Sequence, residues 1–333
     1  MTQKAERLNN NNPVMSVIRG NIGIIVVLLL LFIGLSFTSS VFLTQDNLIT
    51  VLRQISINVF LALGMTLVII LAGIDLSVGA IVALSGTLTV GLIVTTGMPV
   101  YLAIVIGLVI GAAIGFVNGC IVTQFKLPAF IVTLATMNIA QGIAYLYSGG
   151  QSVRIRDAAY TSIGTGQLFG FLPLPVLYMF ILVFIFSTLL MKTKFGTYIY
   201  AIGGNREAAR LSGVPIKKVE IAVYTITGLL AAFAGIVLSA RMYSGQPSVG
   251  AGYEMDAIAA CVLGGVSMAG GRGRISGTIF GAMVIGVISN GLNLLGVSSF
   301  WQLVVKGLII LIAILVDAQK GKKLSFSFKA AKQ

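Results

Sequence analysis

Charged side chains within or between long apolar stretches are the first candidates for chemistry in this chain. Asp75 separates two such stretches in the motif Gly-Ile-Asp-Leu-Ser-Val-Gly (73–79), and Lys306 lies about a third of the way along another. Ionisable groups in apolar segments are costly and persist where they bind ions or protons. Simpler roles also fit, because Asp75 can cap the next helix and Lys306 can reach outward or pair with a carbonyl. The alternatives are a gate or partner contact for Asp75 and a polar path for Lys306.

Motifs for metal binding and catalysis are absent from the sequence. There is no histidine, which excludes a histidine-ligated metal and a His-Glu-x-x-His protease, while Cys120 and Cys261 lie in apolar runs, as expected of small buried side chains. No Gly-x-x-x-x-Gly-Lys-[Ser/Thr] loop is present, and the glycines of 264–273 follow no strand. We therefore expect no cofactor in this chain and no enzymatic activity of its own.

The charged segment 192–218 is a third candidate. Asn205 is a favourable N-cap, Glu207 suits the first turn of a helix, and Gly213 with Pro215 ends the element. The spacing predicts a two-turn helix bounded at both ends. This helix is either a solvated connection or a rigid knob that docks on a soluble partner and passes its motion to the neighbouring helices.

The elements that must position these residues are apolar helices. Hydrophobic residues make up 57% of the 333 positions and charged residues only 9%, against about 25% charged in a soluble domain. A membrane-spanning helix needs roughly 20 apolar residues, and the continuous runs argue against strands. The composition predicts an all-α polytopic membrane protein with about ten transmembrane helices. The runs are 20–38, 55–72, 77–95, 100–123, 128–147, 173–191, 219–240, 249–268, 276–295 and 299–316.

The net charge of +13 becomes interpretable once each charge is assigned to a side of the membrane. With ten spans and a cytoplasmic N-terminus, 17 of the 22 basic residues fall on the cytoplasmic side, four fall outside, and Lys306 falls within a run. Cytoplasmic loops of membrane proteins carry such an excess. We therefore expect both termini in the cytoplasm and no nucleic-acid partner.

The eighth run, 249–268, is the weakest span. Its apolar centre is shorter than a bilayer and ends at Gly264 and Gly265, which is also typical of a re-entrant segment. Re-entry would place the basic C-terminal tail outside, against the charge rule. Ten spans are therefore expected, with Glu254 and Asp256 at the outer end of the eighth.

The predicted organisation is a single transmembrane domain between two cytoplasmic tails. Its parts are the N-terminal tail 1–19, the transmembrane domain 20–317 with an outer loop 148–172 and a cytoplasmic loop 192–218, and the basic tail 318–333. A slight internal similarity links 55–95 with 249–295, since a glycine-rich turn breaks an apolar run in each. Paired interrupted helices point to the transport path in carriers built from repeats.

The cytoplasmic loop resembles a known family. Glu207-Ala208-Ala209, three residues and then Gly213 resemble the E-A-A-x-x-x-G loop of ATP-binding-cassette importer permeases. The longer stretch 201–214 resembles the branch that imports ribose and related monosaccharides, and the resemblance extends over about 45–317. Further segments that agree are 73–79 (GIDLSVG), 252–260, 262–267 (VLGGVS) and 291–297 (GLNLLGV).

The resemblance implies the permease subunit of a bacterial inner-membrane importer that moves a monosaccharide, ribose first, into the cytoplasm. It implies as partners a second permease copy in a homodimer, a cytoplasmic ATPase with two nucleotide-binding domains that holds ATP and magnesium, a periplasmic sugar-binding protein and membrane lipid. The residues of the implied coupling helix are Asn205, Glu207, Ala208, Ala209 and Gly213. Separately from the resemblance, the residues predicted at a cytoplasmic turn or gate are Asp75, Ser77 and Arg272.

Polar side chains within the runs are candidates for the sugar pathway. A neutral polyol needs transient hydrogen bonds from amide and hydroxyl groups. Buried amides also hydrogen-bond between helices, so both roles stay open for each residue. The candidates are Asn118, Asn138, Gln141, Asn290 and Asn293.

Two other classes of function compete with this interpretation. An ion-gradient-coupled secondary carrier acting alone is the main alternative, although it usually needs ionisable groups in the membrane, of which this chain has almost none. A membrane anchor or sensor is disfavoured because no soluble signalling domain is attached. Related permeases also handle xylose, arabinose, galactose and allose, so the sugar is not fixed by these residues.

Overall fold

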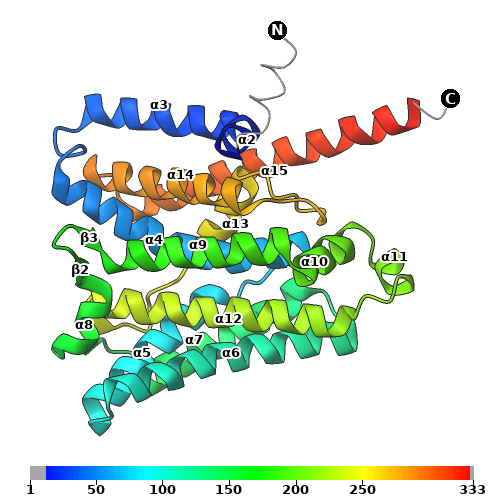
Figure 1. Ribbon diagram of the computed structural model, residues 1–333. Coiled ribbons are helices and arrows are strands. Elements are labelled where there is room, and N and C mark those ends of the chain that lie inside the picture. The colour runs from blue at the N-terminus through cyan, green and yellow to red at the C-terminus, as the bar shows by residue number, and fades with distance from the viewer. Residues whose placement is uncertain (1–12, 331–333) are drawn as a thin grey trace.

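The computed structural model describes residues 13–330 and is a bundle of helices that run roughly along one axis (Figure 1). Of the predicted tails, residues 1–12 and 331–333 lie outside this description. The helices are α2 (Pro13–Gly20), α3 (Ile22–Thr38), α4 (Gln45–Ile70), α5 (Val78–Thr96), α6 (Val100–Phe125), α7 (Ala129–Ser148), α8 (Ala158–Thr165), α9 (Leu174–Lys192), α10 (Lys194–Gly204), α11 (Arg206–Leu211), α12 (Ile216–Arg241), α13 (Tyr253–Leu263), α14 (Ile275–Leu294) and α15 (Ser299–Ala330). The strands are β1 (Val153–Arg154), β2 (Gln167–Leu168), β3 (Leu172–Pro173) and β4 (Ser244–Gly245), with β1 antiparallel to β4 and β2 to β3.

Seven of the described helices are long and apolar enough to cross a membrane: α4, α5, α6, α7, α9, α12 and α14. Two shorter apolar helices, Ile22–Thr38 and Ser299–Leu315, accompany them. The predicted all-α, multi-pass class is confirmed, while the count of ten transmembrane helices and the cytoplasmic placement of the termini stay predictions.

Proline and glycine set several helix boundaries. α6 and α7 begin directly after Pro99 and Pro128, where a proline without an N–H costs no helical hydrogen bond. α5 and α7 end at Gly97 (φ +66°) and Gly149 (φ +61°), left-handed positions that favour glycine. These boundaries confirm the apolar runs predicted for the two helices around each turn.

The eighth predicted span is wrong as a continuous helix. Of the run 249–268, only the eleven residues of α13 (Tyr253–Leu263) are helical. At about 1.5 Å per residue, α13 is about 16 Å long, roughly half of the 30 Å hydrocarbon core. Gly250 (φ +89°) and Gly252 (φ +86°) keep the preceding backbone out of the helix.

The non-helical segment before α13 packs along α5. A Cβ added at Gly245 would lie 2.7 Å from the Cα of Thr87, and Gly250 lies against the backbone of Gly79. Irregular backbone is tolerated at membrane depth only where protein buries it. The close glycine contacts provide that burial, and they place the start of α13 beside the start of α5.

Two interrupted helix pairs run in opposite directions. α4 is followed by the non-helical residues 71–77 and then α5, and α12 is followed by 242–252 and then α13. The Gly271 N–H donates to the Ile70 carbonyl (2.8 Å) near α10, while Arg53 at the other end of α4 donates to the Thr165 carbonyl beside the end of α12. The predicted partner of 55–95, residues 249–295, comprises α13, the glycine-rich loop 264–274 and α14, so that pairing stays a prediction.

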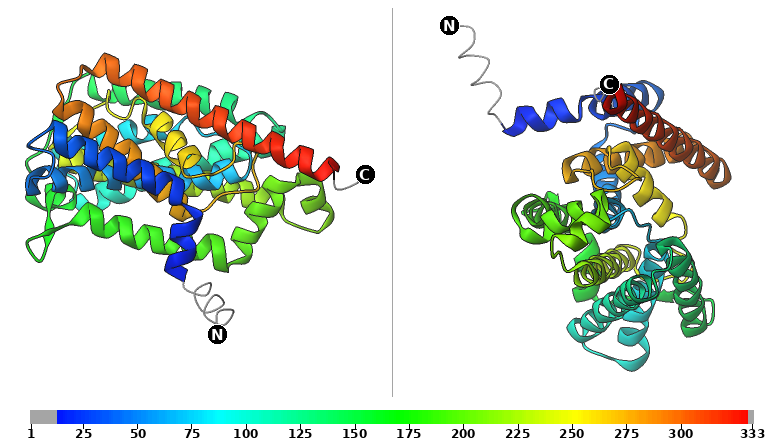
Figure 2. Two further views of the ribbon diagram at one scale, coloured as in Figure 1. Left: turned by 90° about the horizontal axis from the view of Figure 1, so that it is seen from above. Right: turned by 90° about the vertical axis from the view of Figure 1, so that its right-hand side faces the viewer.

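Glycines allow the helices at the centre to approach closely. Gly111, Gly115 and Gly119 follow one face of α6 against α12, where a Cβ at Gly111 would lie 2.6 Å from the Gly228 carbonyl oxygen. Such small-residue contacts replace the hydrophobic driving force that lipid removes. α4 and α12 lie between α3, α14 and α15 on one side and α5, α6 and α7 on the other (Figures 1 and 2). The most buried of the long helices are α4, α5, α12 and α14.

The two ends of the bundle differ in character. We call the end formed by α10, α11, the turn between α6 and α7, and the loop 264–274 the basic end (Figure 1). Two pockets at this end are lined by seven cations. They are Lys126, Arg206, Arg210, Lys217, Lys218, Arg272 and Arg274. The opposite end carries α8 and the strand pairs.

Candidate functional site

The α11 helix of the basic end is held by its caps. The Asn205 side-chain oxygen accepts a hydrogen bond from the Ala208 N–H (3.0 Å), which confirms the predicted N-cap. At the other end Gly213 has φ +78°, and its N–H donates to the Arg210 carbonyl (3.1 Å). The helix spans only Arg206–Leu211, slightly less than the predicted two turns.

The surface of α11 is free within the described protomer. Ala209 is buried against the bundle, whereas Glu207, Ala208 and Gly213 are exposed, and Leu211 is 79% exposed. Glu207 pairs with Arg210 (2.9 Å) on the outside of the helix. This short, capped helix projects from the basic end, as Figure 1 shows, and the exposed Leu211 gives it an apolar tip.

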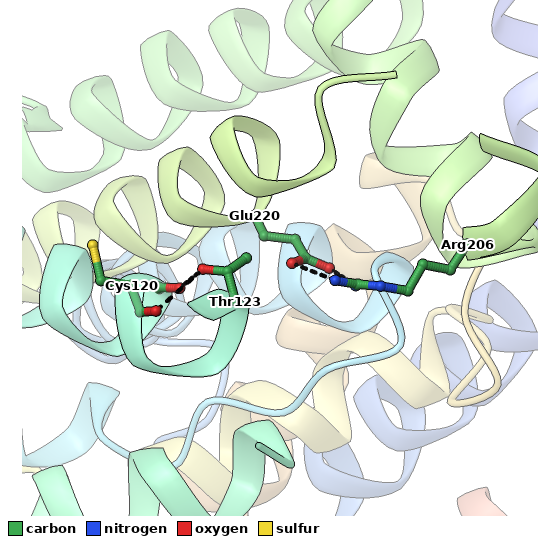
Figure 3. Close-up of polar contacts among 5 residues, drawn as sticks. Cys120, Thr123, Arg206 and Glu220 are labelled. Atoms are coloured by element: carbon green, nitrogen blue, oxygen red, sulfur yellow. Dashed lines mark hydrogen bonds and ion pairs between the residues drawn. The ribbon is translucent and has the colours of Figure 1, made fainter. Parts of the chain in front are cut away.

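Arg206, to which the sequence assigned no role, anchors α11. Its guanidinium forms a two-pronged ion pair with Glu220 on α12, one contact measuring 3.1 Å (Figure 3). The Glu220 side chain is 6% exposed, so the pair is shielded on one side. The pair joins the projecting helix directly to a membrane-spanning one, and its spacing of fourteen residues matches no local helical pattern.

A second unpredicted element, α10, supports α11 from the bundle. The Thr193 hydroxyl accepts from the Gly196 N–H (3.2 Å) and caps this helix. The Tyr200 hydroxyl donates to the Gly273 carbonyl (2.8 Å) in the loop 264–274. Burial raises the pKa of Tyr200, opposed by the nearby Arg274, so its hydroxyl remains a donor.

Asp75 and Ser77 form a buried polar network at the start of α5. One Asp75 carboxylate oxygen accepts from the Ser77 N–H (2.9 Å) and hydroxyl (2.6 Å), and Ser77 itself occupies the N-cap position. The Ser77 hydroxyl accepts from the Asn118 amide (3.0 Å), whose oxygen accepts from Thr136 (2.6 Å). The second Asp75 oxygen is buried without a hydrogen-bond partner in the described part of the chain.

Arg272 occupies a different part of the basic end. It is exposed and lines a pocket of about 960 Å³ with Tyr200 and Arg274, between α9, α10 and the start of α14. Asp75 and Ser77 are fully buried in the network above. The three residues predicted as one turn or gate therefore belong to two neighbouring loops, which touch where Gly270 packs against Ala72.

Two of the five predicted pathway amides join helices. Asn118 is fully buried in the Ser77–Thr136 network, and Asn290 on α14 exchanges hydrogen bonds with Asn47 on α4 (2.8 and 3.2 Å). Both amides therefore have the interhelical role that the sequence left open.

The other three amides lie nearer the surface of the protomer. Asn138 is exposed on α7 and donates to the Leu134 carbonyl (3.1 Å), and Gln141, one turn later, donates to the Pro247 carbonyl. Asn293 is exposed near the end of α14 and accepts from Gln302 (2.8 Å). Asn138 and Gln141 share a side of α7, whereas Asn293 belongs to a distant helix.

An ion pair between α13 and α15 was missed by the sequence analysis. The Lys306 ammonium donates to the Asp256 carboxylate (2.8 Å), and the two side chains are 25% and 6% exposed. The carbonyl pairing considered for Lys306 is therefore replaced by an acid fifty residues away. Asp256 lies in the first turn of a half-length helix, and the pair fixes that helix to its neighbour.

These features define a multi-pass helical membrane protein with interrupted helices at its centre and a projecting capped helix at one end. Residues 47–314 match the family described as the permease component of branched-chain amino acid transport systems. The chain belongs to this family.

Curated relatives cover nearly the whole chain. A ribose import permease protein of Bacillus subtilis is 48% identical over 296 residues, 88% of this chain and 91% of the relative. The corresponding protein of Escherichia coli K12 is 46% identical over 300 residues (89% and 93%), and an L-arabinose transport system permease protein of the same organism is 41% identical over 300 residues (90% and 91%). No solved structure matches the chain.

Proposed function

We propose that this chain is the membrane-spanning subunit of an ATP-driven importer that moves ribose into the cytoplasm. The identity of 48% and 46% to ribose import permease proteins over about nine tenths of the chain supports ribose over arabinose, for which the identity is 41%. The structural feature that supports this function most directly is α11, a capped and exposed helix attached to the bundle through Ala209 and the Arg206–Glu220 pair.

In this proposal α11 is the coupling helix of a partner ATPase. Asn205 and Gly213 fix its ends, and Glu207, Ala208 and Leu211 form the surface that the ATPase grips. ATP and magnesium bind to the partner, and its closure pulls α11. The Arg206–Glu220 pair transmits the pull to α12, and through 242–252 to the half-helix α13.

The remaining partners and the placement follow from the same scheme. The basic end faces the cytoplasm of a bacterial cell, the protein lies in the inner membrane, and a periplasmic binding protein delivers sugar at the end that carries α8. Two permease copies form a homodimer, and the exposed face of α7 that carries Asn138 lines the sugar pathway. The ion-driven carrier is not favoured, because in the part of the chain described Lys306 and Asp256 neutralise each other.

Ribose uptake by a reconstituted system tests the proposal. Glu207→Lys reverses a charge on the grip surface, and we expect it to abolish uptake of labelled ribose while the protein stays in the membrane. Lys194→Glu is the matched control, because it reverses an exposed charge on α10 at the same end and should leave most uptake intact. Gradient-driven uptake by the purified chain in liposomes without an ATPase would instead establish a secondary carrier.

A further inference from the structure

A pocket of about 650 Å³ lies between the end of α6, the α11 helix and the start of α12. Five cations line it, namely Lys126, Arg206, Arg210, Lys217 and Lys218, against one acid, Glu207. Figure 3 shows the Arg206–Glu220 pair together with Thr123 of α6, whose hydroxyl donates back to carbonyls of its own helix. The pocket is therefore a basic cavity, whose wall shares Arg206 and Glu207 with the proposed coupling helix, whereas Lys126, Lys217 and Lys218 have no role in the proposed transport cycle.

The charge of this pocket is only partly neutralised. Arg206 pairs with Glu220 and Arg210 with Glu207, whereas Lys126, Lys217 and Lys218 form no ion pair with the side chains that the structure describes, those of residues 15 and 17–315. Three uncompensated ammonium groups thus converge on one cavity. Such a site favours an anion with several oxygen acceptors, and a phosphate group meets that requirement.

The backbone at Lys126 is held in an unfavourable conformation. This residue has φ +55°, a left-handed position that is uncommon for side chains other than glycine and asparagine. It ends α6 and projects an exposed lysine at the mouth of the pocket. Strained positions of this kind persist where surrounding structure or a ligand requires them.

An apolar surface leads up to the pocket along α6. Phe116, Val117 and Phe125 are 51%, 48% and 68% exposed, and Leu127 follows directly after Lys126 with 45% exposed. Only 22% of the apolar window of α6 is buried within the protomer. A ligand with a phosphate head and hydrocarbon chains can therefore place the head among the lysines and the chains along α6.

We propose that this pocket binds the headgroup of an anionic phospholipid, with its acyl chains on α6. Basic pockets between membrane helices on the cytoplasmic side recognise such headgroups, and a free phosphate or an acidic protein surface would leave the exposed α6 face unused. Because the Arg206–Glu220 wall also holds α11, the bound lipid rests against the mount of that helix. The binding itself does not depend on which sugar crosses the protein.

Lipid titration of the purified full-length chain in neutral detergent tests this site. Dioctanoyl phosphatidylglycerol is added, and binding is read as bound lipid in native mass spectrometry and as a shift of the unfolding midpoint. The arms use dioctanoyl phosphatidylcholine, glycerol 3-phosphate and inorganic phosphate as probes. We expect saturable binding of phosphatidylglycerol, little binding of phosphatidylcholine, and weak binding of both chain-free anions.

The variants separate this pocket from general attraction to a basic surface. Lys217→Gln with Lys218→Gln should weaken phosphatidylglycerol binding about thirtyfold, since each of the two lysines near an anionic lipid contributes about 1 kcal/mol and about 1.4 kcal/mol is a factor of ten. The matched control is Lys192→Gln with Lys194→Gln, which removes two exposed lysines of the same end outside the pocket and should bind as the parent does. Arginine at 217 and 218 should retain binding, which distinguishes charge loss from misfolding.

Three results would overturn the proposal. Equal weakening by both double variants would mean a diffuse surface effect. Glycerol 3-phosphate or inorganic phosphate binding as tightly as phosphatidylglycerol would mean a site for a soluble anion. Unchanged lipid binding in the 217/218 variant, together with loss of co-purifying ATPase, would assign the lysines to a protein interface.

Discussion

The ion pair between Lys306 and Asp256 permits a sharp test of how the half-helix α13 is held. The perturbation is Lys306→Met, which keeps an unbranched apolar stem and removes the ammonium. The carboxylate of Asp256, 6% exposed, then loses the partner that lies 2.8 Å away. A buried charge left without its partner lowers the free energy of unfolding strongly, because neither water nor a counter-ion replaces the lost contact.

The expected magnitude follows from the burial of the two groups. Breaking a fully buried pair costs about 3–5 kcal/mol, whereas an exposed pair contributes about 0–1 kcal/mol. Asp256 is almost fully buried but Lys306 is 25% exposed, so we expect about 3 kcal/mol for Lys306→Met. Asp256→Asn should cost less, about 1–2 kcal/mol, because the lysine can turn its ammonium outward along its flexible stem.

A double-mutant cycle isolates the pair from these individual effects. The double variant removes both charges and therefore leaves no buried ion behind, so its cost should fall below the sum of the single variants by about 2 kcal/mol. The assay is unfolding in mixed micelles with increasing dodecyl sulfate, followed by far-ultraviolet circular dichroism. Lys194→Met, which removes an exposed lysine without an ion pair among the described residues, is the control and should lie within about 0.5 kcal/mol of the parent.

The reasoning is refuted if Lys306→Met behaves like the control, or if the two single costs add in the double variant. Either result would mean that the two charges do not interact in the folded protein. A coupling near 2 kcal/mol with reduced ribose uptake would in addition connect the pair to transport.

Three further predictions concern other contacts. Gly115→Ala should destabilise the protein by about 1–3 kcal/mol in the same unfolding assay, because the added Cβ meets the Tyr224 backbone on α12. Gly142→Ala on α7 is the control: its Cβ meets nothing within 4 Å, so it should be neutral or stabilising. Asn290→Leu should lower the free energy of unfolding by about 1–3 kcal/mol, because it leaves Asn47 without its reciprocal hydrogen bond. The exposed Asn138→Ala is the control and should change it by no more than about 0.5 kcal/mol. Equal effects of the two variants would contradict the assignment of Asn290, but not Asn138, to a structural interhelical role. Arg206→Gln should speed hydrogen exchange in 206–213 and lower uptake several-fold, whereas Lys217→Gln should leave exchange in α11 unchanged; slow exchange in both variants would remove the anchoring role of Arg206.

Most of the helical boundaries could be predicted from hydropathy and from proline and glycine. The runs 100–123 and 173–191 lie within two residues of α6 (Val100–Phe125) and α9 (Leu174–Lys192). This agreement has a simple cause, because membrane helices satisfy their own backbone and need apolar side chains over a fixed length. The segment around α11 was predicted in a different way, from the capping residues Asn205 and Gly213.

Helix ends differ from the apolar runs where polar residues are satisfied by distant partners. α4 starts at Gln45, ten residues before the predicted run, because Asn47 and Arg53 find partners in Asn290 and in the Thr165 carbonyl. Hydropathy counts such residues as loop, although a hydrogen bond across the bundle removes their cost.

The failure at 249–268 is of a different kind and bears directly on the site. Apolar composition reports that a segment is buried, and a non-helical backbone is equally buried when glycines such as Gly245 and Gly250 let it lie against α5. The sequence therefore predicted burial correctly and the conformation wrongly. With α13 cut to half a span, Asp256 lies in the first turn of a short helix instead of at the outer end of a long one, where it meets Lys306. The irregular backbone thus shortens α13, and the short α13 places Asp256 where it meets Lys306. A variant that forms a continuous helix over 249–268 should therefore separate Asp256 from Lys306.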